Sequence, residues 1–210
     1  MLQVGGASGI TGTGALNLGG GSLQVIASAL TTNIAIGLTG TNSVVDTNGF
    51  GATFGGVMSG TGGFTKAGAG TLSLTAANVY LGGTTISTGT LQVGNGGTSG
   101  SIVGNVIDNG TLAFNRSNPS AFAGAISGAG GVIKLGAGVL ALSGPGTYAG
   151  VTSVNAGTLQ AGAANVFFRR QRLHGRRRRD ARAGQLQQRH RVACRRRRRD
   201  AGIGAADQRQ

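Results

Sequence analysis

The sequence has few of the residues that build a large apolar core or cross-link a chain. Its 210 residues include no Trp, two Tyr, seven Phe, two Pro and one Cys. So few aromatic residues argue against a thick core of packed rings, and a single Cys cannot form an internal disulfide. No run of about 18 apolar residues occurs, which excludes a membrane-spanning helix. Scarce proline and the lack of a three-residue glycine period exclude collagen.

Glycine is abundant, and positive charge is concentrated at one end. The 43 Gly residues disfavour helices, because each interior Gly costs roughly 1 kcal/mol relative to Ala. Residues 168–210, called the basic tail, hold 16 Arg against three Asp, with both His and the single Cys, Cys194. Residues 1–167, called the body, carry only five charged side chains: Asp46, Lys66, Asp108, Arg116 and Lys134. We therefore expect two separate parts, a glycine-rich domain and a low-complexity, disordered extension.

The basic tail has three interpretations. Its arginine runs, 176–179 and 195–199, could bind polyanions such as nucleic acids through their phosphates, or form a disordered extension because like charges repel. The tail also lacks Ser, Thr and Asn, which are frequent in the body. Out-of-frame translation of a GC-rich gene fits this composition best, since a one-nucleotide shift gives back Gly-, Ala-, Thr- and Leu-rich sequence. No specific nucleic-acid partner is therefore expected.

The body repeats itself with a step of 68 residues. Between residues 54–93 and 122–161, 19 of 40 positions are identical without a gap. The identical positions include Lys66 and Lys134, Tyr80 and Tyr148, and the stretches 89–92 and 157–160. Self-similarity at a fixed step indicates a repeat architecture.

Short segments of the repeat alternate apolar with small polar residues, as in 71–75, 84–87, 90–93 and 111–114. This alternation, bounded by Gly and Asn, predicts β-strands. Strands this short with no helix between them are typical of a solenoid. Dividing the step by three gives about 23 residues per coil, and Leu72, Leu91 and Leu112 should face one interior. The alternative is an antiparallel β-sandwich, but the repeat is shorter than the roughly 100 residues of such a domain.

The body offers little material for catalysis or metal binding. It has no His, Cys or Glu, so a Ser-His-Asp arrangement would lack its base. Asp46 and Asp108 are expected to be turn residues in Asp-Thr-Asn-Gly and Asp-Asn-Gly sequences, rather than a carboxylate pair. Clustered metal ligands are also lacking. The sequence therefore predicts no catalytic, cofactor-binding or metal-binding residues and no cofactor.

Three further features have competing interpretations. Residues 144–149 fit a Gly-x-Gly-x-x-Ala turn, but without a following helix and a βαβ unit a dinucleotide site is not predicted. Lys66 and Lys134 are expected to be solvated at a coil edge, with a binding ladder as the alternative. Tyr80 and Tyr148 are expected to cap the apolar interior rather than to bind a ligand.

The repeat resembles the autotransporter-associated β-strand repeat. The similarity lies in residues 59–75 (SGTGGFTKAGAGTLSLT), 78–86 (NVYLGGTTI) and 89–93 (GTLQV), with a second copy at 127–160. Residues 45–49 (VDTNG) resemble the segment that usually precedes such a repeat. The resemblance implies a right-handed parallel β-helix in the passenger region of a type V secreted bacterial protein, at the cell surface, in the outer membrane or secreted. A C-terminal outer-membrane β-barrel normally carries such a region; from these residues we expect neither that barrel nor a signal peptide in this chain.

The function that these observations predict is a non-catalytic fragment of an autotransporter passenger, acting as a surface stalk or adhesin scaffold. Its partners would be host or matrix surface molecules, or other copies of itself. Two alternatives stay open. The chain could be part of a passenger enzyme whose catalytic residues lie elsewhere, or a nonspecific nucleic-acid and polyanion binder acting through the basic tail.

Overall fold

The structure is a computed structural model of the chain. It describes residues 1–5, 10, 12–27, 29–41, 43–164 and 166, with the backbone of 173–175. The chain divides at Gly175 into two units, of which the first is Met1–Gly175. Of the basic tail the structure describes only the backbone of 173–175, which forms a strand, contrary to the expectation of disorder there. The arginine runs and Cys194 lie outside the described residues, so the other interpretations of the tail remain predictions.

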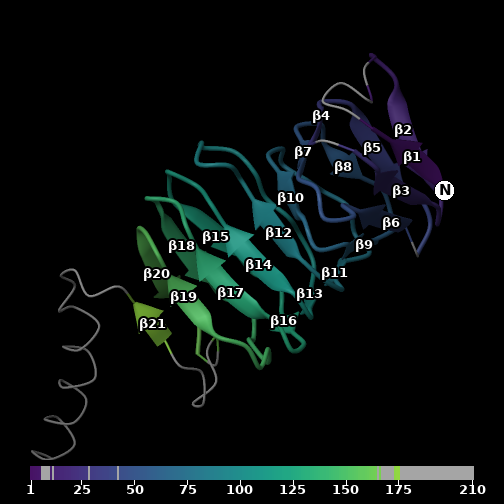
Figure 1. Ribbon diagram of the computed structural model, residues 1–210. Helices are drawn as coiled ribbons and strands as arrows, with labels where there is room; N and C mark the ends of the chain where they lie inside the picture. The colour runs from purple at the N-terminus through teal and green to yellow at the C-terminus, as the bar shows by residue number, and fades with distance from the viewer. Residues whose placement is uncertain are drawn as a thin grey trace, which may run out of the picture. The chain divides into compact units, whose positions relative to one another are not determined.

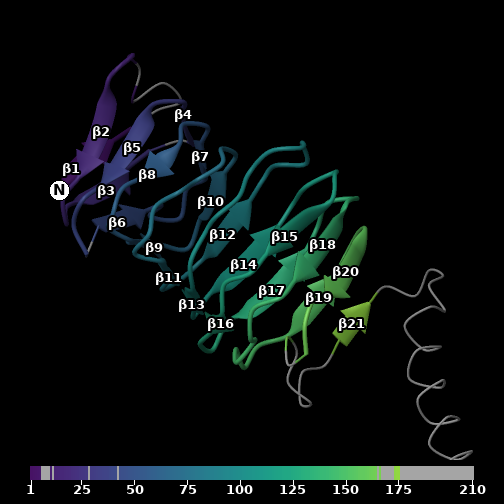
Figure 2. The same ribbon diagram turned by 180° about the vertical axis from the view of Figure 1, so that it is seen from behind.

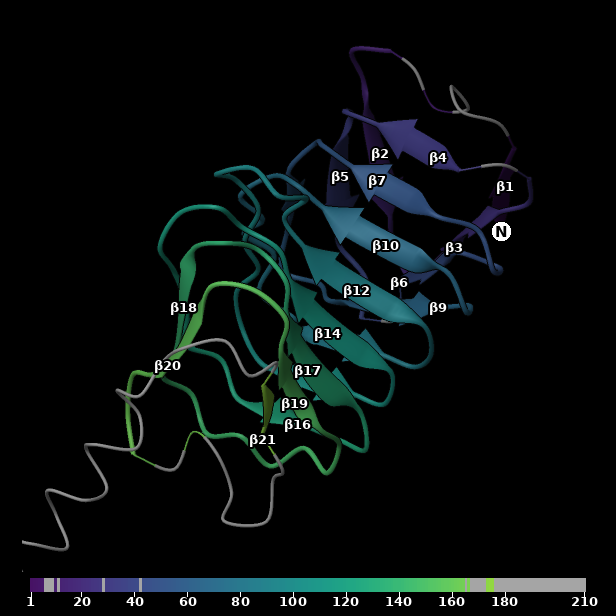
Figure 3. The same cartoon turned by 60° about the vertical axis from the view of Figure 1, so that its left-hand side comes forward.

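The described chain is an all-β solenoid built from parallel strands, as predicted. A first sheet contains seven strands: β1 (Leu2–Val4), β3 (Ser22–Val25), β6 (Ser43–Asp46), β9 (Phe64–Ala67), β11 (Thr84–Ile86), β13 (Val106–Asp108) and β16 (Ile126–Ser127). A second sheet contains eight: β4 (Leu30–Thr32), β7 (Ala52–Phe54), β10 (Thr71–Leu74), β12 (Thr90–Val93), β14 (Thr111–Phe114), β17 (Gly131–Lys134), β19 (Thr152–Val154) and β21 (Leu173–Gly175). Figure 1 shows the rungs following one another, and Figure 3 shows most strands of the second sheet side by side.

A third face closes each coil. It consists of two three-stranded sheets, β2 (Ala15–Leu18), β5 (Ala35–Leu38) and β8 (Met58–Ser59), then β15 (Ser120–Phe122), β18 (Val139–Leu142) and β20 (Thr158–Ala161). Between the two, Ala77 forms an isolated parallel bridge with Ser101. The view from behind shows β2, β5 and β8 at one end and β15, β18 and β20 at the other (Figure 2). The chain therefore passes from first sheet to second sheet to third face, and then begins the next coil.

Each coil is shorter than the sequence step suggested. Along the first sheet Phe64 pairs with Thr84, which pairs with Val106, and along the second Leu72 pairs with Leu91. These pairs are 20, 22 and 19 residues apart, so the expectation of about 23 residues per coil was wrong. Three coils consume fewer residues than one 68-residue repeat.

Because one repeat is longer than three coils, each copy of the repeat begins on a different side of the solenoid from the copy before it. Strands β9 and β11 lie in the first sheet, whereas their copies β17 and β19 lie in the second. Strands β10 and β12 lie in the second sheet, whereas their copies β18 and β20 lie on the third face. Successive repeats are thus the same structural unit turned to a different side of the solenoid.

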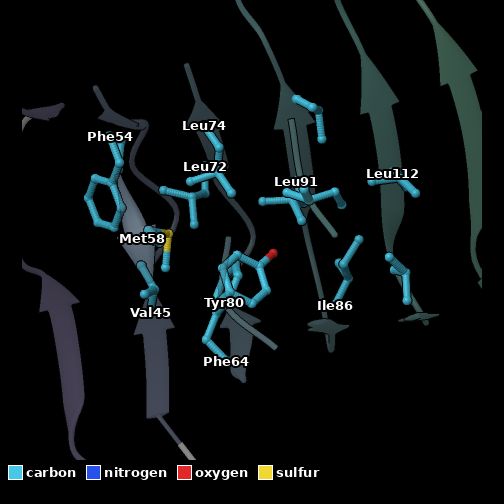
Figure 4. Close-up of a cluster of buried hydrophobic side chains, with 14 of the residues drawn as sticks. Val45, Phe54, Met58, Phe64, Leu72, Leu74, Tyr80, Ile86, Leu91 and Leu112 are labelled. Carbon is cyan, nitrogen blue, oxygen red and sulfur yellow. The ribbon is translucent and has the colours of Figure 1, made fainter. Parts of the chain in front are cut away.

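The interior is a stack of aliphatic columns. Leu72, Leu91 and Leu112 pair in register and are fully buried, so the prediction of a common interior is confirmed. The same column continues to Ala52 on one side and Val132 on the other. Figure 4 shows these leucines from the second sheet facing Val45, Phe64 and Ile86 of the first. One apolar core runs through the coils, as period-two strands with one buried face require.

Glycine occupies a corner where neighbouring coils touch. Gly89 has a φ of 69°, and a Cβ placed there would lie 2.4 Å from the carbonyl oxygen of Gly68 and 2.6 Å from that of Gly70. Only glycine tolerates both the left-handed backbone and such contact. Gly157, its repeat copy, has a φ of 66° and the equivalent close contacts, with Gly136 and Gly138.

Candidate functional site

The most distinctive polar group inside the solenoid is the side chain of Lys66, at the inner face of β9. It is fully buried. Its Nζ donates hydrogen bonds to the carbonyl oxygens of Ala67 at 2.8 Å, Gly68 at 2.7 Å and Thr88 at 3.3 Å. Ala67 is the last residue of β9 and Gly68 lies in the turn that follows it, whereas Thr88 belongs to the next coil. The lysine therefore ties a corner to itself and to its neighbour.

Lys134 repeats this arrangement on another side of the solenoid. It lies at the end of β17 with 1% of its surface exposed, and its Nζ donates to the carbonyl oxygens of Gly136 and Ala156. Gly136 and Ala156 are the repeat copies of Gly68 and Thr88. The expectation that these lysines are solvated was wrong. The sequence did contain a signal for their burial. Each lysine lies two residues after an inward side chain, Phe64 or Val132, and is followed by a glycine turn whose carbonyl groups can accept hydrogen bonds.

Burial governs the ionisation of both lysines. It lowers the pKa of Lys66 to about 8, and the negative charge of Asp46 partly opposes this shift. Burial also lowers the pKa of Lys134. At neutral pH the Lys66 side chain is still mainly an ammonium ion, which has three N–H groups for its three carbonyl partners.

The two acidic residues of the body do not meet. Asp46 is half-buried at the outer side of β6 and accepts a hydrogen bond from Gln24 Nε2 at 2.8 Å. Asp108 is fully buried on the inner side of β13. Strands β9 and β11 separate them in the sheet, so the strands that carry them are about 14 Å apart. A shared proton or a shared substrate atom is out of reach for this pair.

Asp108 is only partly satisfied. Its Oδ1 accepts a hydrogen bond from the N–H of Gly110 at 3.0 Å, whereas Oδ2 has no hydrogen-bond partner within the described structure. Burial raises the pKa of this carboxyl to about 6, although the N–H groups of Gly110 and Leu112 act against the shift. The expectation that Asp46 and Asp108 are turn residues was wrong, because they are the last residues of β6 and β13 and the chain bends only after them. The Asp108 carboxyl is buried inside the protein.

The two tyrosines cap the interior, as predicted. Tyr80 is fully buried, and its hydroxyl lies 2.6 Å from Thr84 Oγ1. Its ring meets Phe64 edge-to-face with ring centres 5.4 Å apart (Figure 4). Tyr148 makes the same 2.6 Å contact with Thr152. Burial raises the pKa of Tyr80, so its hydroxyl stays protonated and serves as a structural hydrogen-bonding group.

Residues 144–149 connect the third face with the next coil. Gly146 forms a parallel bridge with Ile126, and no helix follows in the described chain. This is strand-and-loop geometry, without the helix N-terminus that a dinucleotide phosphate needs.

Arg116 organises a surface loop that sequence reasoning missed. Its NH1 donates to the Gly100 carbonyl at 2.9 Å, its NH2 to the Thr98 carbonyl at 2.7 Å, and its Nε to Asn118 Oδ1 at 3.1 Å. The loop that it holds, residues 95–99, is exposed. A cavity of about 10 Å³ between Arg116 and the apolar core has room for no more than one water molecule.

The surface of the body is nearly free of charge. Of its five charged side chains, Lys66, Asp108 and Lys134 are buried, and only Asp46 and Arg116 reach the outside. No three His, Cys, Asp or Glu residues come together within the described residues. That part of the chain also contains no helix long and apolar enough to cross a membrane. What the structure presents outward is Thr, Ser, Asn, Gly and scattered aliphatic side chains.

Comparison with protein families explains the repeat. The passenger-associated-transport-repeat matches residues 64–93 and 132–161, two segments that are 68 residues apart. Comparisons with curated proteins and with solved structures gave no match. The matched segments begin at the strands that carry the buried lysines, β9 and β17, and end at the second strands after the tyrosines, β12 and β20. The chain therefore carries two copies of this autotransporter passenger repeat, and both copies lie within the solenoid.

Proposed function

We propose that this solenoid is a non-catalytic stalk or adhesin scaffold of an autotransporter passenger, acting at the cell surface or after secretion. The observation that carries the proposal is where the repeated residues lie. Lys66, Tyr80 and Thr84 recur as Lys134, Tyr148 and Thr152 with the same partners, and all six side chains are buried. The residues that the repeat preserves are therefore interior residues of the solenoid.

Some outward positions support the same conclusion, because they change between copies. Thr65 and Thr85 become Ile133 and Ser153, although Thr90 and Gln92 are kept as Thr158 and Gln160. A catalytic repeat would keep polar groups on an accessible face, whereas a scaffold needs only its coil-forming residues. Binding would then depend on outward residues particular to each coil, with uncharged host or matrix surfaces, or other copies of the chain, as partners.

The experiment compares the full chain with a variant that lacks residues 169–210. Both are immobilised on beads and tested for retention on extracellular matrix, on host cells and on a second layer of the same chain. If the solenoid is the binding part, the shortened variant keeps its adhesion at physiological salt. Loss of all binding with the tail would transfer the function to the arginines, and turnover of a polysaccharide or lipid substrate by the shortened chain would overturn the non-catalytic role.

A further inference from the structure

The body contains three Asn-Gly pairs, and the structure treats them differently. They are Asn48-Gly49, Asn95-Gly96 and Asn109-Gly110, and all three asparagines are exposed. Asn-Gly is the sequence in which an asparagine amide is most open to attack by the next backbone nitrogen, because glycine has no side chain to hinder the approach. Exposure and sequence alone therefore rank the three sites equally.

The reaction needs two groups to be free. The backbone nitrogen after asparagine loses its proton and attacks Cγ, so a new N–Cγ bond closes a succinimide ring while the Cγ–Nδ2 bond breaks and ammonia leaves. Water then opens the ring. Opening at the former side-chain carbonyl gives aspartate, and opening at the main-chain carbonyl gives isoaspartate. Hydrogen bonds that hold the attacking N–H or the side-chain amide oppose the first step.

Both groups are held at two of the sites. Gly96 N–H donates to the Asn115 carbonyl at 2.9 Å, and Asn95 Oδ1 accepts from Gln92 Nε2 at 3.2 Å. Gly110 N–H donates to Asp108 Oδ1 at 3.0 Å, and Asn109 Oδ1 accepts from the Ala129 N–H at 3.1 Å. Ring closure at either site would first have to break two hydrogen bonds, and at each site one of the two comes from a neighbouring coil.

Neither group is held at Asn48. Within the described contacts, its side chain and the N–H of Gly49 make no hydrogen bond. The residue sits in a tight turn closed by Phe50 N–H donating to the Thr47 carbonyl at 2.8 Å, with φ of 47° at Asn48 and 83° at Gly49. Asn48 is the one non-glycine residue with positive φ among those described. Asparagine is one of the few residues besides glycine that adopt this left-handed conformation, and the turn leaves the Asn48 side chain exposed.

We propose that Asn48 is a site of spontaneous deamidation, with water as the co-reactant, whereas Asn95 and Asn109 are protected by their coil-to-coil hydrogen bonds. The product places a new carboxylate two residues from Asp46, on a surface that otherwise carries almost no charge. Isoaspartate would also lengthen the main chain by one atom at the corner between β6 and β7. Ageing of the protein would therefore begin at this corner.

The test follows the three sites in one molecule. The full chain is incubated at mildly alkaline pH and about 37 °C. Peptide mass spectrometry then measures the conversion of each asparagine amide to the acid over time. Each hydrogen bond that must break first slows ring closure by about fivefold. Asn48 should therefore react about thirtyfold faster than Asn95 or Asn109. Similar rates at the three sites, or faster reaction at Asn109, would overturn the proposal.

Two controls separate structure from sequence. In concentrated urea the three sites should react at similar rates, because the protecting hydrogen bonds are gone; a persistent advantage of Asn48 there would assign the effect to local sequence instead. The variant Asn48→Gly keeps a residue suited to positive φ and removes the amide. It should lose the early acidic species on ion exchange, and if it does not, the modification lies elsewhere.

Discussion

At the scale of single residues, the buried lysines are the clearest addition to the chemistry of the repeat. A lysine inside a narrow solenoid is tolerated because turn carbonyls surround its ammonium group. Hydrogen bonds to a charged group stabilise more than those between neutral groups. The corner therefore depends on a side chain that composition alone assigns to the surface.

Replacing Lys66 with Met tests this dependence. Lys66→Met should lower the free energy of unfolding by about 3 kcal/mol, because it leaves the Gly68 and Thr88 carbonyls without their donor. The matched control is Thr65→Ile, which copies the residue found at the same position of the second repeat and should change stability by less than about 0.5 kcal/mol. Urea unfolding of the variants measures both. A Lys66→Met protein as stable as the original would mean that the lysine is merely accommodated.

Asp108 predicts how stability depends on pH. Its folded-state pKa of about 6 lies above its ordinary value of 3.8, so the folded chain holds this proton more tightly than the unfolded chain. The resulting stability is fully present below pH 3.8 and is lost as pH rises through about 6. The two-unit difference corresponds to about 3 kcal/mol.

The measurement is urea unfolding at several pH values between these two limits. In the original chain the free energy of unfolding should fall as pH rises, and in Asp108→Asn this fall should disappear. Asp46→Asn serves as the control and should keep it. A flat profile in the original chain would show that Asp108 ionises in the folded state as it does in water.

At the scale of elements, the strands were predictable and their placement was not. The alternation in 71–75, 84–87 and 90–93 is visible to the eye and became β10, β11 and β12. The number of residues per coil was not readable, because identical residues mark where the sequence repeats and not where the chain completes a circuit. From the sequence, Lys66 was expected at the surface because of its charge. Its spacing of two residues from Phe64, which puts both side chains on the same face of a strand, was the better guide.

A methyl group added at a tight corner between strands should lower the stability of the fold strongly. Gly89→Ala adds a Cβ 2.4 Å from the Gly68 carbonyl oxygen at a φ of 69°, and should destabilise the fold by about 3 kcal/mol. Gly97→Ala, in the exposed loop, meets nothing within 4 Å and should be tolerated. Thermal unfolding of the two variants side by side measures the contrast. Equal losses would mean that the loop is as tightly constrained as the corner.

At the scale of the whole unit, the rotation of the repeat limits how it can bind. Because each copy is turned to another side, equivalent outward residues of two copies do not point the same way. One flat partner therefore cannot engage both equivalent sites at once, and avidity through simultaneous engagement is lost for it. The repeat distributes its outward surface around the solenoid, as a spacer or a scaffold for many small partners would require.

The composition of the basic tail leads to a prediction about the gene. Arginine codons of the form CGN, read one nucleotide later, become mostly alanine or glycine codons, and the Asp-Ala-Arg stretch at 180–182 becomes Thr-Leu or Met-Leu. With one choice of the degenerate codon positions, the stretch 185–188 becomes Asn-Phe-Asn-Asn, and 191–194 becomes Gly-Ser-Leu-Ala. These are the residues from which the solenoid is built.

We therefore expect the nucleotide sequence after the Val166 codon to encode further passenger repeats in a shifted frame. The solenoid gives this expectation a physical check, because a continued coil must pair in register with β20, and with β19 in place of β21, at steps of about 20 residues. It must also carry an inward aliphatic column. Sequencing the locus settles the frame, and the intact mass of the expressed protein shows which frame is translated. A shifted frame rich in stop codons and without this alternation would establish the arginine tail as genuine. Its binding to polyanions, measured by the salt dependence of heparin retention, would then become the next question.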